Sequence, residues 1–126
     1  MGLPLMPLAV DVIVTAEDGD PIAPGVVRGR AKVLHAPYEK TLEQGEILVT
    51  RSSDPGWTPI FINAAGVVLE IGGALQHGAV IAREYGLPCV SGLDGVMERI
   101  CDGQMIEVDG SNGVVRLDVP GQEPAA

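Results

Sequence analysis

The chain has 126 residues, of which 46% are hydrophobic and 20% are charged, so it is long enough for one domain with a buried core. Its 8 Lys and Arg residues stand against 17 Asp and Glu residues, which gives a net charge of −9. Binding to nucleic acid or to an anionic membrane depends on clustered Lys and Arg. The sequence lacks such clusters, so it predicts neither kind of partner.

The cysteines and the first residues give no sign of an exported or metal-binding protein. Cys89 and Cys101 form no CxxC motif and the two histidines lie far apart, so no metal site is expected. Cys89 lies in an apolar stretch and is expected to be a buried small hydrophobe. Residues 1–14 contain prolines and Asp11 and have no basic start, which fits neither a signal peptide nor a membrane-spanning helix. A cytoplasmic location is therefore the default.

Residues 1–20 are expected to form an arm or linker and a first strand. The arm is Met1–Leu8, which is interrupted by prolines, and the strand is the β-branched run Val10–Val14. A polar turn follows and ends at Asp20. The stretch Val26–Leu34 then carries basic residues with a period of two at Arg28, Arg30 and Lys32, which predicts a strand with one solvent-facing side.

The rest of the chain reads as short strands alternating with short helices. Further strands are expected at Ile47–Thr50, Val67–Leu69, Cys89–Val90, Met105–Val108 and Val114–Leu117. Helices are expected at Thr58–Asn63, from His77 onward and as one turn within Asp94–Ile100. The residues Asp109-Gly110-Ser111-Asn112-Gly113 are a strong hairpin signal between the last two strands. The pattern predicts an α/β domain over residues 21–118, with several short strands, two or three short helices and a disordered tail at 119–126.

The most informative segment runs from Gly72-Gly73 through His77 to Gly86. His77 opens a run that suits a helix, and Gly86 followed by Leu-Pro is a C-terminal stop signal. Unpaired backbone N–H groups and the macrodipole favour an anion at such a helix start, and the glycines permit close backbone approach. A neutral imidazole can attack phosphorus without a separate base. The segment indicates a phosphate-carrying histidine, and a structural histidine that caps the helix is the alternative.

Other polar and aromatic residues allow two interpretations each. Arg83 could contact a phosphate or a partner domain, or it could be a solvated helix residue paired with a carboxylate such as Glu84. Glu70 precedes the glycine loop and could orient the imidazole or be solvated. His35 is expected at the surface, and Trp57 is expected to anchor the short helix by packing.

Three linked segments resemble the mobile phosphohistidine domain of phosphoenolpyruvate-utilising enzymes. They are Asp54-Pro55-Gly56-Trp57-Thr58-Pro59, then residues 66–73, then residues 77–92, in that order. They look most like the phosphoenolpyruvate synthase and rifampin phosphotransferase branch, and the likeness runs from about Pro24 to Leu117. The resemblance implies a swivelling β/β/α domain.

The resemblance also implies a function, which is to carry a phosphoryl group on a histidine between two remote sites. One site is an ATP-grasp nucleotide-binding domain, and the other binds pyruvate, phosphoenolpyruvate or another acceptor. Carried over by position, His77 is the phosphorylated residue, Gly72 and Gly73 form the loop beside the phosphoryl group, and Arg83 closes the motif. No cofactor is expected on this chain, since Mg²⁺ would be held by the partner domains. The chain alone would accept and carry a phosphoryl group but would not complete a catalytic cycle.

The sequence departs from the pattern of the family in two respects. Its members usually carry a Ser or Thr hydroxyl one or two residues before the histidine, where this chain has Leu75 and Gln76. No hydroxyl is therefore expected to orient the ring, and the amide of Gln76 is the substitute donor. Gly78 replaces the commoner Ala or Ser. The missing hydroxyl favours a rival interpretation as a regulatory or binding module, and a purely structural scaffold is a second rival.

Overall fold

The computed structural model describes residues 12–14, 20–73 and 76–117. The strands are β1 (Val12–Val14), β2 (Asp20–Ala23), β3 (Val26–Val33), β4 (Ile47–Thr50), β5 (Gly66–Leu69), β6 (Cys89–Ser91), β7 (Met105–Asp109) and β8 (Val114–Leu117). The helices are the 3₁₀ turn η1 (Pro55–Trp57), α1 (Thr58–Phe61), α2 (His77–Tyr85) and α3 (Val96–Arg99). The predicted arm Met1–Leu8 and the predicted tail 119–126 lie outside the described residues. Within these ranges no helix is long and apolar enough to cross a bilayer.

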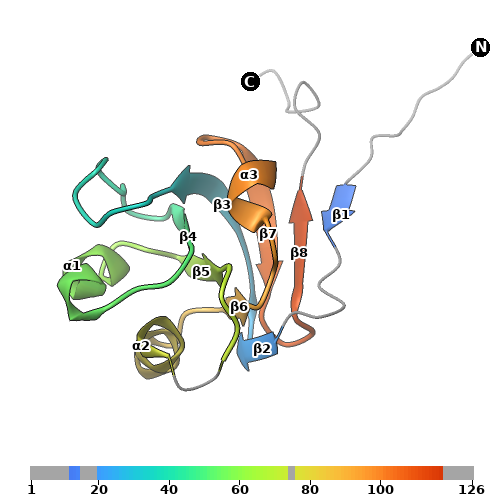
Figure 1. Ribbon diagram of the computed structural model, residues 1–126. Helices are drawn as coiled ribbons and strands as arrows, with labels where there is room; N and C mark the ends of the chain where they lie inside the picture. The colour runs from blue at the N-terminus through green and yellow to red at the C-terminus, as the bar shows by residue number, and fades with distance from the viewer. Residues whose placement is uncertain (1–11, 15–19, 74–75, 118–126) are drawn as a thin grey trace, which may run out of the picture.

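All eight strands belong to one sheet with the order β1-β8-β7-β3-β4-β5-β6-β2, and the sheet folds over at β3. Residues 26–30 of β3 pair antiparallel with β7, whereas residues 31–33 pair parallel with β4. The antiparallel strands β1, β8 and β7 therefore cover one face of the parallel strands β4, β5 and β6. Helices α1 and α2 cover the other face (Figure 1). The predicted β/β/α arrangement is confirmed.

Side-chain alternation along the parallel strands divides the apolar residues between two cores. In β4, Ile47 and Val49 pack against the antiparallel layer, and Leu48 between them packs toward the helices. All three are fully buried, which is why this strand reads as a continuous apolar run. Phe61 and Trp57 fill the helix-side core, so the prediction that Trp57 anchors the short helix is confirmed.

Strand β2 is not predicted by the sequence pattern. The expected polar turn ends at Asp20, whereas Asp20–Ala23 pairs antiparallel with β6 at the edge of the sheet. The strand contains Pro21 and spans 4 residues, so it carries no clear strand signal, and proline is tolerated because the strand lies at an edge. It begins one residue before the predicted 21–118 domain.

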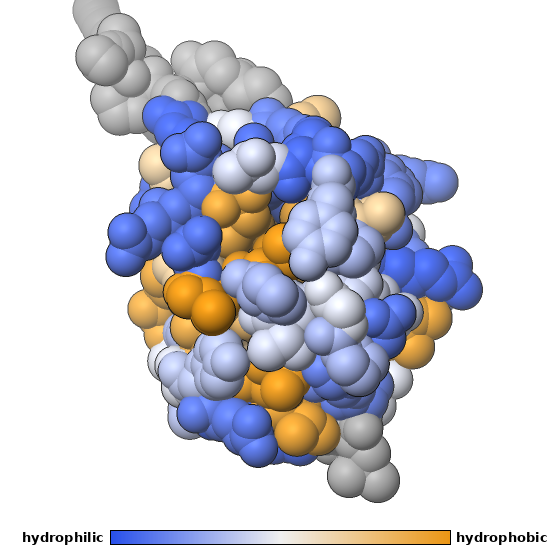
Figure 2. Space-filling model, turned by 90° about the vertical axis from the view of Figure 1, so that its left-hand side faces the viewer, coloured by the Kyte–Doolittle hydropathy of each residue, from blue (hydrophilic) through white to orange (hydrophobic). Residues whose placement is uncertain are grey.

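The helices on the outer face are short and leave apolar surface uncovered. Figure 2 shows this face, where apolar residues reach the surface between polar ones. Ile62, just after α1, is 68% exposed, and Tyr85 at the end of α2 is 44% exposed. The predicted helix from Thr58 ends at Phe61 rather than at Asn63, and the preceding turn η1 is capped by Asp54, which accepts from Gly56 N at 2.9 Å.

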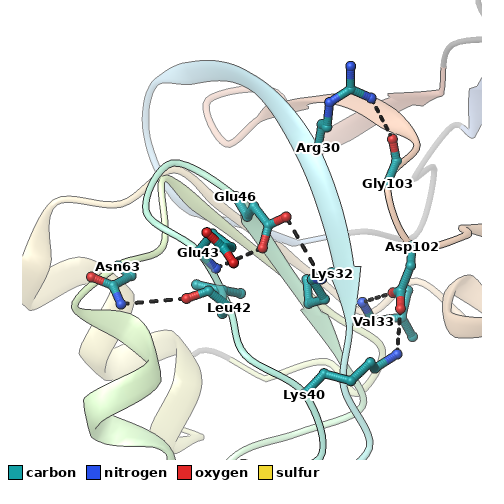
Figure 3. A network of polar contacts seen from close by, with 10 residues as sticks. All are labelled: Arg30, Lys32, Val33, Lys40, Leu42, Glu43, Glu46, Asn63, Asp102 and Gly103. Atoms are coloured by element: carbon teal, nitrogen blue, oxygen red, sulfur yellow. Dashed lines mark hydrogen bonds and ion pairs between the residues drawn. The ribbon is translucent and has the colours of Figure 1, made fainter.

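A polar network ties the loop after β3 to the connection between α3 and β7 (Figure 3). Asp102 accepts hydrogen bonds from Val33 N at 2.6 Å and from Lys40 Nζ at 2.5 Å, and Arg30 donates to Gly103 O at 2.8 Å. Burial by itself would raise the pKa of the Asp102 carboxyl, but the hydrogen bonds from Lys40 and Val33 outweigh burial and lower it. The carboxylate therefore holds two loops that are far apart in the sequence.

The predicted β7–β8 hairpin is confirmed, and its turn fits tightly against the bend between β2 and β3. Gly110 N donates to Gly25 O at 2.8 Å, and Gly25 N donates to Ser111 Oγ at 3.0 Å. A Cβ atom on Gly110 would lie 1.8 Å from Ala23 O and 2.8 Å from Cys89 N. Both neighbours are backbone atoms that no rotamer change can move, so only glycine fits.

We predict that Gly110→Ala lowers the free energy of unfolding by at least about 2 kcal/mol, because the backbone of β2 must shift to admit the methyl group. Urea unfolding followed by circular dichroism measures this. Gly56→Ala is the matched control, since its Cβ would meet only Asp54 Oδ1 at 3.2 Å. Equal losses in the two variants would contradict the packing argument.

Asp109, a residue that is 6% exposed, closes the same hairpin turn with its carboxylate. It accepts from Asn112 Nδ2 at 2.9 Å, Asn112 N at 3.0 Å and Ser111 N at 3.1 Å. The side-chain hydrogen bond from Asn112 is the largest effect on its pKa, and together with the backbone donors it lowers the pKa against the opposing effect of burial.

A lowered folded-state pKa stabilises the protein at pH values above about 3.9, the ordinary value for Asp, and this contribution is lost as the pH falls through the folded value. We predict that Asp109→Asn costs about 1–2 kcal/mol at pH 7 and loses less further stability than the wild type between pH 4 and pH 2. Urea unfolding at several pH values measures both. Asp94→Asn, at an exposed position, is the control, and a parallel fall in the Asp109 variant and the wild type would contradict the prediction.

Candidate functional site

His77 is the first residue of α2 and lies at the carboxyl edge of the parallel strands, where β5 ends at Leu69. Gln76 precedes it with extended backbone (φ −70°, ψ 159°), and Gly86 ends the helix in the left-handed region (φ 72°, ψ 28°). Both predicted ends of the helix are confirmed. Helix N-termini and the carboxyl ends of parallel strands are the places where α/β folds bind anions and phosphorylated ligands.

A hydroxyl from a distant part of the sequence contacts the imidazole. Ser53 lies in the loop after β4, 24 residues before His77, and its Oγ is 2.9 Å from His77 Nδ1. The expectation that the ring has no hydroxyl partner is therefore wrong. That expectation rests only on the residues next to His77 in the sequence. Parallel pairing of β4 and β5 brings the loops after both strands to one edge of the sheet, so Ser53 comes close to His77. Nε2, the other ring nitrogen, has no hydrogen-bond partner among the described residues.

Phe61 restrains the imidazole from a second direction. Its ring centroid lies 6.2 Å from that of His77 with an interplanar angle of 89°, which is an edge-to-face arrangement. Phe61 is fully buried in the helix-side core, so it is a fixed wall rather than a mobile one. From the sequence, Phe61 is expected only as part of the short helix Thr58–Asn63, and no local motif marks its contact with His77.

Gly78 makes the contact between Ser53 and His77 possible. A Cβ atom at this buried position would lie 2.9 Å from Ser53 Oγ and 3.0 Å from Leu69 Cδ1. An alanine or serine would therefore push the hydroxyl away from the ring or lift the first turn of α2 from the sheet. The departure from the commoner family residue and the hydroxyl from the β4 loop are parts of one local arrangement.

Gln76 contacts the loop that contains Gly72 and Gly73, and its amide is not directed to the imidazole. The side-chain amide of Gln76 donates to Ile71 O across the loop, so this donor is used to hold the loop. Gly73 has φ +124°, a conformation that L side chains rarely adopt. Gly72, just before it, is exposed, and Leu75 lies outside the described residues.

Arg83 lies in the exposed last turn of α2, six residues after His77 and therefore about 9 Å farther along the helix axis. Its charge acts on the thiol of Cys89. Burial raises the pKa of Cys89 to about 12, against the smaller lowering effect of Arg83. The prediction that Cys89 is a buried hydrophobe is confirmed, and the proposed role of Arg83 at the phosphate stays a prediction.

Glu70 is directed to a cation and not to the imidazole. Its side chain is 16% exposed, its Oε1 lies 4.0 Å from Arg51 Nη1, and within the described ranges it makes no ion pair with His77. His35 is at the surface as predicted, and its Nδ1 lies 3.5 Å from Glu39 Oε1. The described part of the chain contains no group of three metal-ligating side chains.

Known proteins match this chain over the segment that contains the site. A family model described as "PEP-utilising enzyme, mobile domain" matches residues 42–113. Rifampicin phosphotransferase of Bacillus cereus is 50% identical over 99 residues, which are 79% of this chain and 11% of that protein. Phosphoenolpyruvate synthase of Aeropyrum pernix is 42% identical over 99 residues, which are 77% of this chain and 12% of that protein. The chain thus spans about a tenth of the length of these curated relatives.

A solved structure agrees with these sequence matches. The solution structure of Enzyme I (nEIt) superimposes with a TM-score of 0.54 and 28% sequence identity, over 64% of this chain and 34% of that one. The matched chain is again longer than this one, so the shared unit is a domain-sized part of a larger protein in that case as well.

We predict that Ser53→Ala changes the tautomer balance of His77, because Nδ1 loses its partner, and costs about 1 kcal/mol of stability. Gly78→Ala should change the ring in the same way by displacing the hydroxyl, and it should add no further change to the ring when Ser53 is already alanine. Ring ¹⁵N chemical shifts of His77 measure this. Ser52→Ala, at an exposed neighbouring position, is the control. A wild-type ring spectrum in Gly78→Ala would contradict the steric link.

Proposed function

Because the chain belongs to the mobile-domain family of PEP-utilising enzymes, we propose that it carries a phosphoryl group on His77 Nε2 between a donor site and an acceptor site of partner domains. The observation that carries the proposal is the 2.9 Å contact of Ser53 Oγ with His77 Nδ1 at the start of α2. That contact orients the ring, and Nε2 has no partner in the described ranges. It lies at a helix N-terminus, where phosphate oxygens can meet backbone N–H groups.

The transfer requires one tautomer of His77. When Nδ1 carries the proton and its N–H group donates a hydrogen bond to Ser53 Oγ, the lone pair of Nε2 can attack phosphorus. The new N–P bond forms as the bond from phosphorus to the donor oxygen breaks, and that oxygen leaves with the electron pair. The acceptor later attacks the same phosphorus, the N–P bond breaks, and the electron pair returns to Nε2. The proton on Nδ1 stays in place through both steps.

The charge of the moving phosphoryl group must be neutralised from outside this site. In the described part of the chain, Ser53 and Phe61 contact the imidazole and Gly78 leaves room for Ser53, and none of these three residues is charged. Partner domains would supply Lys, Arg and Mg²⁺, as is general for phosphoryl transfer. The family resemblance suggests an ATP-grasp domain as one partner and a domain for phosphoenolpyruvate, pyruvate or another acceptor as the other. The chain is then a phosphotransferase component that does not turn over alone.

Ser53 also bears on the rival interpretation as a regulatory module. The feature that favoured that interpretation was the absence of a hydroxyl next to His77 in the sequence. Ser53 supplies a hydroxyl from another loop, and Gly78 leaves room for it. The geometry therefore favours the carrier over a module that has lost the relay.

Labelling tests the proposal directly. The purified chain is incubated with phosphoenolpyruvate, or with ATP labelled at the β or γ phosphate, together with a dialysed lysate of the source cells. We expect acid-labile, alkali-stable label on the wild type and none on His77→Gln. Ser53→Ala should slow labelling by roughly tenfold to a hundredfold, because the ring loses its orientation.

The controls separate chemistry from folding. Ser52→Ala should label like the wild type, mass spectrometry should place the phosphate on the peptide with His77, and circular dichroism should show each variant folded. A rifampicin phosphotransferase labelled in parallel shows that the assay works. If the folded wild type takes no label while that enzyme does, the regulatory module becomes the better interpretation.

A further inference from the structure

A second hollow lies at the carboxyl edge of the parallel strands, apart from the contacts of His77. Its volume is about 260 Å³, and it is lined by His35, Arg51, Glu70, Met97 and Glu98. Three of these residues follow β3, β4 and β5, and the other two come from α3. Nothing in the phosphohistidine site uses these side chains.

Strand alternation explains why the hollow opens on the other face of the sheet from His77. Leu69, the last residue of β5, packs in the helix-side core, so the next residue, Glu70, points toward the antiparallel layer and α3. Arg51 follows the last residue of β4 in the same way. Ser53 and His77 lie on the helix side of this edge. A domain that docks on the edge therefore meets both features.

The hollow contains two carboxylates, the shielded Glu70 and the exposed Glu98, that accept no hydrogen bond from the residues the structure describes. Glu70 is 16% exposed, and Arg51 Nη1 at 4.0 Å is too far away to donate a hydrogen bond. Glu98 makes no ion pair within the described ranges, and His35 already lies beside Glu39. A shielded carboxylate without a close donor is a strong acceptor for a charged donor from outside.

The wall and the charge of the hollow indicate which donor fits. Met97 is partly buried and packs against the core between the two β layers, so it offers an apolar surface to an alkyl stem. A guanidinium group can reach two carboxylates with its planar fork, which an ammonium group does less well. The net charge of −9 also favours a basic surface on any protein that docks here.

We propose that the hollow binds an arginine side chain of the domain with which His77 exchanges the phosphoryl group. The identity of that partner rests on the proposed function, whereas the preference of the hollow for a guanidinium group does not. Bound between Glu70 and Glu98 with its stem on Met97, the arginine would fix the partner against the edge of the sheet that carries His77.

Methyl-labelled methionine in the full chain gives a direct test. The chain has 4 methionines; Met97 lines the hollow, and Met105 in β7 is an internal reference. The protein is titrated with n-butylguanidinium at fixed ionic strength, and with butyrate and n-butanol as comparison probes. We expect a saturable shift of the Met97 methyl signal with n-butylguanidinium only, and no shift at Met105.

Charge variants give the sign of the interaction. Glu98→Gln and Glu70→Gln should each raise the Kd for n-butylguanidinium by roughly threefold to tenfold. Arg51→Gln should lower it, because a competing cation is removed, whereas an anion-binding hollow would give the opposite result. Glu84→Gln, an equal change of charge on α2, should leave the Kd unchanged. His77→Ala should also bind like the wild type, so this result does not depend on phosphorylation.

Three results would overturn the proposal. They are the absence of any saturable shift at Met97, tighter binding of butyrate or n-butanol than of n-butylguanidinium, and an equal loss in Glu84→Gln and Glu98→Gln. If His77 takes no label while Met97 still responds to the cation, the proposed function fails and the hollow stands as a guanidinium site. The two failures are therefore distinguishable.

Discussion

The arrangement of the molecule depends on β3, which exchanges one hydrogen-bonding partner for another along its length. Its first part belongs to the antiparallel layer and its second part to the parallel strands, so one strand joins both β layers. Because the parallel strands then have a covered face on each side, their side chains divide between two cores. The histidine site and the charged hollow both lie at the carboxyl ends of these parallel strands.

At that edge, close packing and chemistry constrain each other. Gly78 permits the first turn of α2 to approach Leu69, and the same lack of a side chain leaves room for the hydroxyl of Ser53. The ring of Phe61 packs edge-to-face against the imidazole of His77 from the side of the core. The imidazole is thus oriented by one hydrogen bond and one aromatic wall, and neither group brings charge. The proposed carrier function fits these uncharged contacts, because a permanently bound cation would favour retention of a phosphoryl group over its release.

At this edge, His77 lies on the helix side of the sheet and the charged hollow lies on the opposite side. The helix side presents His77 at a helix N-terminus, and the opposite side presents the carboxylates of Glu70 and Glu98 beside Met97. An interaction with a partner's arginine would act on docking and not on the bond that is transferred. Electrostatic complementarity of this kind governs the rate and specificity of association more than the strength of the final contact. The polar network of Asp102 keeps the loop after β3, and with it one wall of the hollow, in place.

The sequence by itself determined the helix from His77 to the Gly86 cap, the buried parallel strands and the hairpin around Asp109, since each depends on local periodicity or turn chemistry. It also determined the family, through three linked motifs. Only the tertiary structure decided that β2 is a strand, because an edge strand with a proline is formed by its partner β6 and not by its own propensity. The same holds for Ser53, Phe61 and the hollow around Glu70. Their contacts join segments that lie far apart in the chain, and no local pattern encodes a distance across strands that pair only when the whole sheet has formed.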